Sequence, residues 1–433
     1  MRYTPEWIHA LRDALAHDTE WGRRHRGLSA TVCLEFGPAC YLAVFRDGIL
    51  VRAQEGVGFT QSWDFAIRAP QSAWDALLAA VPAPGKQSLF ALMKAGEVVL
   101  EGDMRLFMQH VWAIVRLVEV MRALDGATPT ASGAVPSYAS AVRPAGRGNT
   151  EPARIEPIVG RYLHMTASGV DYRVYFEEAG AGIPLVCLHT AGADGRQYRD
   201  LLNDGAIADH YRVIAFDMPW HGKSLPPDRF WETKYQLTTD HYIAVIEAFC
   251  AALALDRPVL MGCSMGGKIM LEAAARCTAD ARAVIGLEAA DDQGHWFDLG
   301  WLDHPQMHGA EVGASLVQAL CAPQSSEARK REIWWQYVQG GPGIFPGDLH
   351  FYRVDKGFPE RVKTIDTSRC AVYLLTGEYD FSCRPEDTIR TGGKIPGAEV
   401  TIMRELGHFP NCECPERFRE YLLPVLERIR GTV

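Results

Sequence analysis

The pattern of apolar and polar residues changes once along the chain, and each part predicts a different architecture. Within the first 124 residues, helical spacing of apolar positions is found over residues 5–17, 71–81 and 103–124. Runs of strand character are interspersed with these helices, at residues 29–36, 41–48, 49–54, 63–69 and 96–102. Strands and helices without regular alternation are typical of an α+β domain.

Beyond about residue 156, short apolar runs mostly alternate with helical stretches such as 241–255 and 268–276. The apolar runs are residues 183–189, 211–217, 258–264, 283–289, 371–377 and 399–405. Continuous apolar strands separated by helices predict an α/β fold with a doubly wound, mostly parallel sheet. Ligands bind such sheets at the carboxyl ends of the strands, so the residues directly after each strand are the candidates for chemistry.

The segment that separates these two patterns has neither period. It is rich in Ala, Gly, Pro, Ser and Thr, which is typical of a flexible linker. We therefore expect a first domain of residues 1–125, a linker of residues 126–155 and a second domain of residues 156–433.

Charge and composition narrow the class of protein. The 433 residues include 44 Lys and Arg against 53 Asp and Glu, a net charge of −9. Residues 1–150 hold 15 basic and 14 acidic side chains, so the acidic excess belongs to the second domain, which argues against a nucleic-acid partner. The sequence has no apolar run that would span a membrane and no signal-peptide core at its start. Its 11 cysteines lack paired spacing, so we expect reduced thiols and a cytoplasmic location.

The run 258–264 ends in the sequence Gly262-Cys263-Ser264-Met265-Gly266-Gly267, and a predicted helix follows. A serine nucleophile that projects from a tight turn between strand and helix needs neighbours almost without side chains two positions before and after it. The start of the helix also favours developing negative charge. We therefore predict that Ser264 is a nucleophile.

A nucleophilic serine needs a base and a carboxylate that orients the base. Asp380 follows the run 371–377, and His408 follows the run 399–405. The chain order of serine, acid and histidine is that of the α/β-hydrolase triad. Three other acids compete with Asp380 for the orienting role, namely Glu378, Asp291 and Asp292.

The charge that forms on the substrate oxygen needs two backbone N–H donors. Met265, directly after the nucleophile, is expected to supply one. Ala191, in the glycine-rich loop after the run 183–189, is expected to supply the other, with Thr190 as the alternative donor. Thr190 is also a candidate for contact with the substrate.

On these residues, positions 156–433 resemble the α/β-hydrolase superfamily. The resemblance includes the Ser264 motif, the Gly377–Asp380 turn, the residues around His408, and a loop at residues 216–224 that looks like the family's D-x-P-x-x-G-x-S segment. Two departures affect the pocket: Thr190 follows His189 where the family usually has a glycine, and Trp220 stands where a small residue is common. Trp220 is therefore a candidate for contact with the substrate.

The resemblance further implies a helical cap at about residues 292–368. That stretch is rich in aromatic residues, which suggests a bulky apolar or aromatic substrate, with Trp296 and Trp334 as candidate contacts. His304 and His308 would share a helix face as metal ligands if one helix ran through both, but Pro305 interrupts it. We expect neither a metal nor a cofactor.

Residues 20–123 more weakly resemble the SCP2-like sterol and lipid-carrier domain, through residues 65–78 and 96–104. The resemblance implies an α+β layer with an apolar tunnel for a lipid. A packing or dimerisation module with a filled core is the alternative, so a lipid ligand and a homo-oligomer both stay open.

The sequence as a whole favours a serine hydrolase of the carboxylesterase kind. Such an enzyme would cleave a small-molecule ester through an acyl-enzyme on Ser264. Two alternatives remain. The first is a C–C bond hydrolase of aromatic ring-cleavage products, because the sequence around Ser264 is close to that branch's GNSMGG. The second is a lipid-binding or carrier protein with an auxiliary hydrolase domain.

Overall fold

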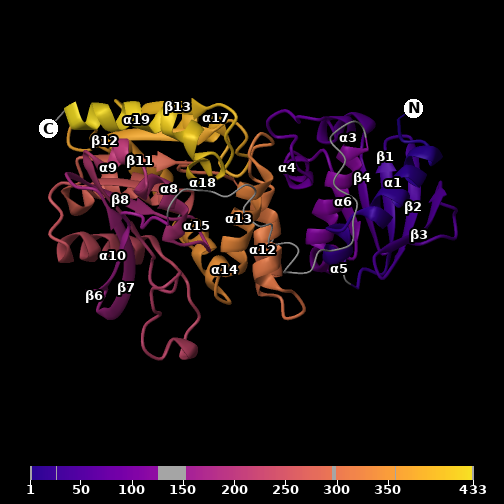
Figure 1. Cartoon of the computed structure of the whole chain (residues 1–433), viewed down its shortest axis with the longest axis horizontal. Coiled ribbons are helices and arrows are strands. Elements are labelled where there is room, and N and C mark those ends of the chain that lie inside the picture. The colour runs from indigo at the N-terminus through magenta and orange to yellow at the C-terminus, as the bar shows by residue number, and fades with distance from the viewer. Residues whose placement is uncertain (1, 26, 125–152, 295–298, 356, 432–433) are drawn as a thin grey trace. The chain divides into compact units, whose positions relative to one another are not determined.

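The structure is a computed structural model that describes residues 2–25, 27–124, 153–294, 299–355 and 357–431. The chain divides into two compact units, Met1–Ile155 and Glu156–Val433, and both are drawn in Figure 1. Almost all of the predicted linker, residues 126–155, lies outside the described residues.

Unit 1 is built on a five-stranded sheet in the order β3-β2-β1-β4-β5. Strands β1 and β4 are parallel, and the other neighbours are antiparallel. The elements in chain order are α1 (Pro5–His17), α2 (Trp21–Arg24), β1 (Ala30–Phe36), β2 (Ala39–Arg46), β3 (Ile49–Glu55), β4 (Phe65–Ala69), α3 (Gln71–Leu77), α4 (Leu89–Lys94), β5 (Val99–Gly102), α5 (Met104–Gln109) and α6 (Val111–Ala123). The single helix expected over 103–124 is therefore two helices, which meet at His110, where the backbone is not helical (φ −114°, ψ 18°).

Unit 2 is built on an eight-stranded sheet in the order β13-β12-β11-β10-β8-β9-β7-β6. Its strands are β6 (Val159–Ala167), β7 (Val170–Ala179), β8 (Ile183–Leu188), β9 (Tyr211–Phe216), β10 (Val259–Cys263), β11 (Ala283–Leu287), β12 (Ala371–Gly377) and β13 (Glu399–Met403). The six predicted strands pair in parallel, as expected. The antiparallel strands β6 and β7, at one edge, were not among the predicted strands.

Helices cover both faces of this sheet. They are α8 (Arg199–Leu202), α9 (Gly205–Ala208), α10 (Thr239–Ala252), α11 (Met265–Arg276), α17 (Pro385–Gly392), α18 (Pro410–Glu413) and α19 (Pro415–Gly431). Short 3₁₀ helices form at Gly195–Tyr198, Phe230–Glu232 and Thr278–Asp280. Helices α10 and α19 lie on opposite sides of the strands (Figure 1).

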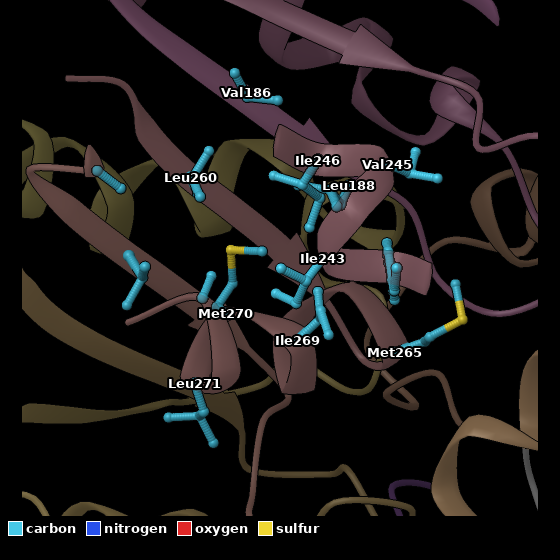
Figure 2. Packing of buried hydrophobic residues seen from close by; sticks show 14 of the residues in the cluster. Val186, Leu188, Ile243, Val245, Ile246, Leu260, Met265, Ile269, Met270 and Leu271 are labelled. Carbon is cyan, nitrogen blue, oxygen red and sulfur yellow. The ribbon is translucent and has the colours of Figure 1, made fainter. Parts of the chain in front are cut away.

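Alternate residues of each central strand point to opposite faces, as the pleat requires. Leu260 packs with α10 and α11, whereas its neighbours Val259 and Met261 pack with α19. Figure 2 shows part of the first cluster, in which Met270 of α11 lies near Leu260 and Ile269 of α11 lies near Ile243 of α10. Burial of one such side chain contributes roughly 1.5–3 kcal/mol. This packing therefore holds α11, and the turn at its start, firmly on the sheet.

A helical insertion lies between β11 and β12, at the position predicted for the cap. It comprises α12 (Gly309–Gln318), α13 (Glu327–Val338), α14 (Ile344–Leu349), α15 (Phe351–Val354) and α16 (Phe358–Arg361), with 3₁₀ helices at Leu299–Asp303 and Val362–Thr364. In the part of the chain that the structure describes, no helix is long and apolar enough to cross a membrane. The eleven cysteines are free thiols.

Candidate active site

The turn between β10 and α11 places Ser264 in a strained conformation. Its φ is 57° and its ψ is −111°, values that cost a non-glycine residue about 1–3 kcal/mol. The glycines around it cannot be replaced without a clash. A Cβ on Gly262 would overlap the backbone of Gly266, one on Gly266 would overlap the carbonyl of Leu188, and one on Gly267 would overlap the carbonyl of Leu287. The G-x-S-x-G-G spacing is therefore a steric requirement of this turn.

His408 and Asp380 meet at the carboxyl end of the sheet. His408 Nδ1 lies 2.7 Å from Asp380 Oδ2, and both residues are buried. The other Asp380 oxygen accepts the backbone N–H groups of Ser382 and Cys383, at 2.7 and 3.1 Å. Because a carboxylate can only accept, Nδ1 carries the proton and Nε2 is left as the basic nitrogen. This is the tautomer that a general base needs.

The backbone of His408 is also held in place, by groups beside the serine and in the cap. The Cys263 thiol donates to the His408 carbonyl at 3.2 Å. The His408 N–H donates to the carbonyl of Leu320 at 3.2 Å. The Cys263 side chain, directly before Ser264, therefore connects the serine turn to the histidine loop.

The three competing acids have other partners. Asp291 accepts from the Thr391 hydroxyl at 2.8 Å and also pairs with Lys394. Asp292 accepts the Gly294 N–H at 2.9 Å, and Glu378 accepts the Glu405 N–H at 3.1 Å. Asp380 is therefore the predicted acid that the fold brings to His408.

The loop after β8 lies next to the serine turn. The Thr190 N–H donates to Gln197 Oε1 at 3.0 Å, so this amide already has a partner inside the loop. Among the described residues, no hydrogen bond uses the Ala191 N–H. Met265 is the first residue of α11, where a backbone N–H has no partner within the helix. This geometry favours Ala191 over Thr190 as the second oxyanion donor, although both assignments stay predictions.

A buried polar cluster supports this loop from behind. Asp348, on α14 of the cap, accepts the Gly192 N–H at 2.7 Å, the Tyr235 hydroxyl at 2.8 Å and His221 Nε2 at 2.8 Å. His221 Nδ1 lies 2.9 Å from the Pro219 carbonyl, so both ring nitrogens face acceptors and both donate. Burial lowers the pKa of His221, but the charge and hydrogen bond of Asp348 outweigh it and raise the pKa above its ordinary value.

His189 lies against His221, with 4.7 Å between the ring centroids. Its surroundings lower its pKa, whereas those of His221 raise the pKa. Its Nδ1 faces the Thr190 carbonyl at 2.8 Å, and its Nε2 accepts the Met218 N–H at 3.1 Å. Burial, reinforced by the charge of His221, lowers the pKa of His189 to about 4. His189 is thus a neutral support of the loop after β8.

Two tyrosines of the cap, which were not among the predicted contacts, lie at the serine and its loop. The Tyr352 hydroxyl lies 3.4 Å from Ser264 Oγ, and the Tyr337 hydroxyl lies 2.6 Å from Thr190 Oγ1. Trp334 is on the same helix as Tyr337, and no described contact joins it to Ser264. Trp296 lies outside the described residues. The aromatic content of residues 292–368 predicted rings near the substrate, but the spacing of these residues does not indicate which rings reach Ser264.

Two cavities flank the loop that follows β8, and Gly192 of this loop lines both. One, of about 480 Å³, is lined by Trp220 together with Asp194, Arg196 and Lys223. The other, of about 420 Å³, lies between the loop and the cap. Ser264 lines neither, so the predicted contact between Trp220 and substrate stays a prediction.

His304 and His308 of the cap do not share a helix. His304 follows the 3₁₀ helix Leu299–Asp303, and His308 caps α12, with its Nδ1 accepting the Glu311 N–H at 3.2 Å. The group of potential metal ligands found within the described residues is Glu288, Asp380 and His408. Glu288, at the carboxyl end of β11, was not among the predicted acids.

Comparisons with known proteins agree on the second unit. Residues 185–421 match the model of the Alpha/beta hydrolase family. A 2-hydroxy-6-oxo-6-(2'-aminophenyl)hexa-2,4-dienoic acid hydrolase of Metapseudomonas resinovorans is 37% identical over 105 residues, 24% of this chain and 33% of that protein. A putative non-heme haloperoxidase of Mycobacterium phage D29 is 33% identical over 127 residues, 29% of this chain and 42% of that protein.

The chain thus spans less than half the length of these two relatives. Among solved structures, a thermophilic esterase from Thermogutta terrifontis superposes with a TM-score of 0.55 at 18% identity, covering 62% of this chain and 99% of that one. At this level of identity the likeness concerns the fold. With more than half of its residues matched by the family model, the chain belongs to the alpha/beta hydrolase family.

Proposed function

We propose that this protein is a serine hydrolase that cleaves a carboxylic ester of a bulky apolar or aromatic substrate through an acyl-enzyme on Ser264. The observation that carries the proposal is the 2.7 Å contact between His408 Nδ1 and Asp380, which leaves the basic nitrogen of His408 for a serine hydroxyl. The strained Ser264 at the start of α11 supports it, since such strain concentrates at functional sites.

In the proposed reaction, Ser264 Oγ attacks the ester carbonyl while His408 Nε2 takes the hydroxyl proton. Asp380 holds the imidazole in place and stabilises its positive charge. The N–H groups of Ala191 and Met265 donate to the oxyanion, and each such donor accounts for about 10²–10³ in kcat. His408 returns the proton to the leaving alcohol, and water then hydrolyses the acyl-enzyme in the reverse sequence of proton transfers.

The cap supports the proposed substrate class. Tyr352 brings an aromatic ring and a hydroxyl beside Ser264 Oγ, so an acyl group bound to the serine would contact Tyr352. Thr190, Trp220 and Trp334 remain candidate contacts, and Trp296 remains one on sequence grounds alone. A small-molecule ester with an apolar or aromatic group suits such surroundings.

A fluorophosphonate probe with an intact-mass readout tests the nucleophile. We expect one adduct on the wild type and none on Ser264→Ala. Cys263→Ala, which changes the adjacent residue and keeps the serine, is the matched control and should still be labelled. An unlabelled wild type would refute the proposal. A series of p-nitrophenyl esters with lengthening acyl chains then measures the size of the pocket through kcat/KM.

A C–C bond hydrolase of aromatic ring-cleavage products is the second candidate. It is favoured by the 37% identity over 105 residues to a hydrolase whose name specifies a hexa-2,4-dienoic acid substrate. A vinylogous 1,5-diketone acid, followed by loss of its absorbance, tests it against the ester series. Turnover of the diketone at a kcat/KM well above that of every ester would decide for this candidate.

For unit 1 we keep the resemblance to an SCP2-like domain as a proposal, with an apolar ligand in its interior. A fluorescent fatty acid titrated into the full chain carrying Ser264→Ala tests ligand binding without hydrolysis. Saturable binding supports a carrier role, and its absence favours a packing or dimerisation module, which sedimentation of the same sample would report.

A further inference from the structure

Glu288 is a fully buried acid next to the proposed catalytic machinery. It directly follows β11, has a φ of 53°, and is 0% exposed. The N–H of Gly377, the last residue of β12, lies 3.0 Å from each of its carboxyl oxygens. The end of the neighbouring strand therefore fixes this side chain, and the left-handed backbone aims it toward the triad.

The carboxyl groups of Glu288 and Asp380 are too close to ionise independently of each other. One oxygen of Glu288, one oxygen of Asp380 and a ring nitrogen of His408 all lie within 4.8 Å of one another. Two buried carboxylates this close strongly disfavour the doubly ionised state, because burial leaves their repulsion little screened by water. The negative charge is better stabilised on Asp380, since Asp380 accepts hydrogen bonds from two backbone N–H groups and from His408, whereas Glu288 accepts one from a backbone N–H.

We propose that Glu288 is a protonated carboxylic acid that donates a hydrogen bond to the Asp380 carboxylate, so that the pair shares one proton and one negative charge. Glu288 is then a positioning residue that acts through Asp380 on His408. This inference rests on the proposed serine-hydrolase function. No proton leaves the pair during turnover, because the proton of Ser264 moves to His408 and on to the leaving group.

The surroundings of Glu288 support the neutral form. Burial, followed by the charge of Asp380 and the hydrogen bond with it, raises the pKa of Glu288 well above its usual range, and the Gly377 N–H opposes this only in part. The titratable groups that face the pair from the elements packed against it are Cys263 at the end of β10, Cys383 before α17, Glu413 on α18, and His408. Of these groups, His408 alone can be positively charged, and it is hydrogen-bonded to Asp380 rather than to Glu288.

A consequence follows for a protein that lacks Asp380. Without Asp380, Glu288 loses the neighbouring charge and hydrogen bond that, after burial itself, most favour its protonated form. It would then ionise within reach of His408 and take over part of the orienting role. Glu288 therefore stabilises the Asp380 carboxylate in the wild type and can partly replace it when Asp380 is removed; we call the second role the reserve role.

Difference infrared spectroscopy tests the protonation directly and needs no substrate. At pH 7 the wild type should have the carbonyl stretch of a protonated carboxylic acid, and Glu288→Gln should lack it. Glu378→Gln, which changes a half-buried carboxylate at the neighbouring strand end, is the matched control and should keep the band. If wild type and Glu288→Gln give the same carboxylic acid signal, Glu288 is ionised and the inference is wrong.

A double-mutant cycle on ester hydrolysis tests the reserve role. Glu288→Gln keeps a donor toward Asp380, so it should lower kcat by less than about threefold when Asp380 is present. In the Asp380→Ala background the same change should lower kcat by about tenfold or more, because the remaining carboxylate is lost. Equal factors in both backgrounds would overturn the inference.

The two tests separate this inference from the proposed function. A wild type that takes the fluorophosphonate label but lacks the infrared band would leave the serine hydrolase standing and refute the Glu288–Asp380 pair. The band in an unlabelled protein would establish the pair and refute the hydrolase. If the doubly substituted chain does not fold, the infrared comparison on Glu288→Gln alone decides.

Discussion

Replacement of Asp348 by Asn should disturb the oxyanion loop from the cap. Asp348 is 0% exposed and accepts three donors: the Gly192 N–H, the Tyr235 hydroxyl and His221. Asn is isosteric but has one acceptor oxygen and an NH₂ group. Its amide nitrogen must therefore face at least one of these donors, and His221 loses its counter-ion.

The magnitude follows from these contacts. Removal of one partner of a buried ion pair costs about 3–5 kcal/mol. His221 can relieve part of this cost by releasing its proton, so we expect Asp348→Asn to lower the free energy of unfolding by about 2–4 kcal/mol. The loss of an oxyanion donor costs about 10²–10³ in kcat, and here the donor is displaced rather than removed, so kcat should fall by about 10- to 100-fold.

The loss of stability should also depend on pH in a defined direction. Because the pKa of His221 is raised in the folded state, the pair's contribution is fully present below the unfolded pKa of about 6.5 and is lost as pH rises through the folded value. The difference in unfolding free energy between wild type and Asp348→Asn should therefore be larger at pH 6 than at pH 9.

Urea unfolding at both pH values and kcat on a p-nitrophenyl ester measure the two effects. Asp303→Asn is the matched control in the cap, because Asp303 pairs with Lys234 at 2.8 Å on the exposed surface. Such exposed pairs are worth about 0.2–1 kcal/mol. If Asp348→Asn behaves like Asp303→Asn in stability and kcat, the cap does not position the oxyanion loop and the reasoning fails.

Three further predictions concern the helix after the serine and the triad. Gly267→Ala places a Cβ against the Leu287 carbonyl, so it should lower the unfolding free energy by about 1–3 kcal/mol in urea, and an unchanged midpoint would contradict the steric argument. Burial lowers the pKa of Lys268 from 10.5 to about 8, so the charged side chain destabilises the fold below that pH. The free energy of unfolding should therefore rise between pH 8 and 10 in the wild type but not in Lys268→Met. His408→Ala should lower kcat for esters by about 10³-fold, and a small loss of kcat would exclude His408 as the base.

The comparison of sequence with structure is most informative for unit 2. The six parallel strands were predictable because buried strands are continuous apolar runs, and such runs are visible in a short window. The edge strands β6 and β7 were not predicted, since they carry exposed and half-buried residues such as Tyr162 and Arg173 that blur the pattern. In unit 1, the helix expected over 103–124 is interrupted at His110, because periodicity does not register a local break.

For the site, the sequence by itself determined the parts whose chemistry needs a fixed local spacing. The glycines around Ser264 are such a part, because steric limits on one tight turn operate within a few residues. The order of serine, acid and histidine after three of the parallel strands is another, because parallel strands bring their carboxyl ends to one edge. These features lie in short stretches of chain and can be read there.

Only the tertiary structure decided which distant side chains meet. It placed Glu288 beside Asp380, directed Asp291 to Lys394, and brought Tyr352 to Ser264 and Asp348 to Gly192. These partners are all between 88 and 156 residues apart. The contacts of Tyr352 and Asp348 depend on how the helical insertion folds back over the sheet. Packing of the whole unit sets that path, and no local pattern of residues encodes it.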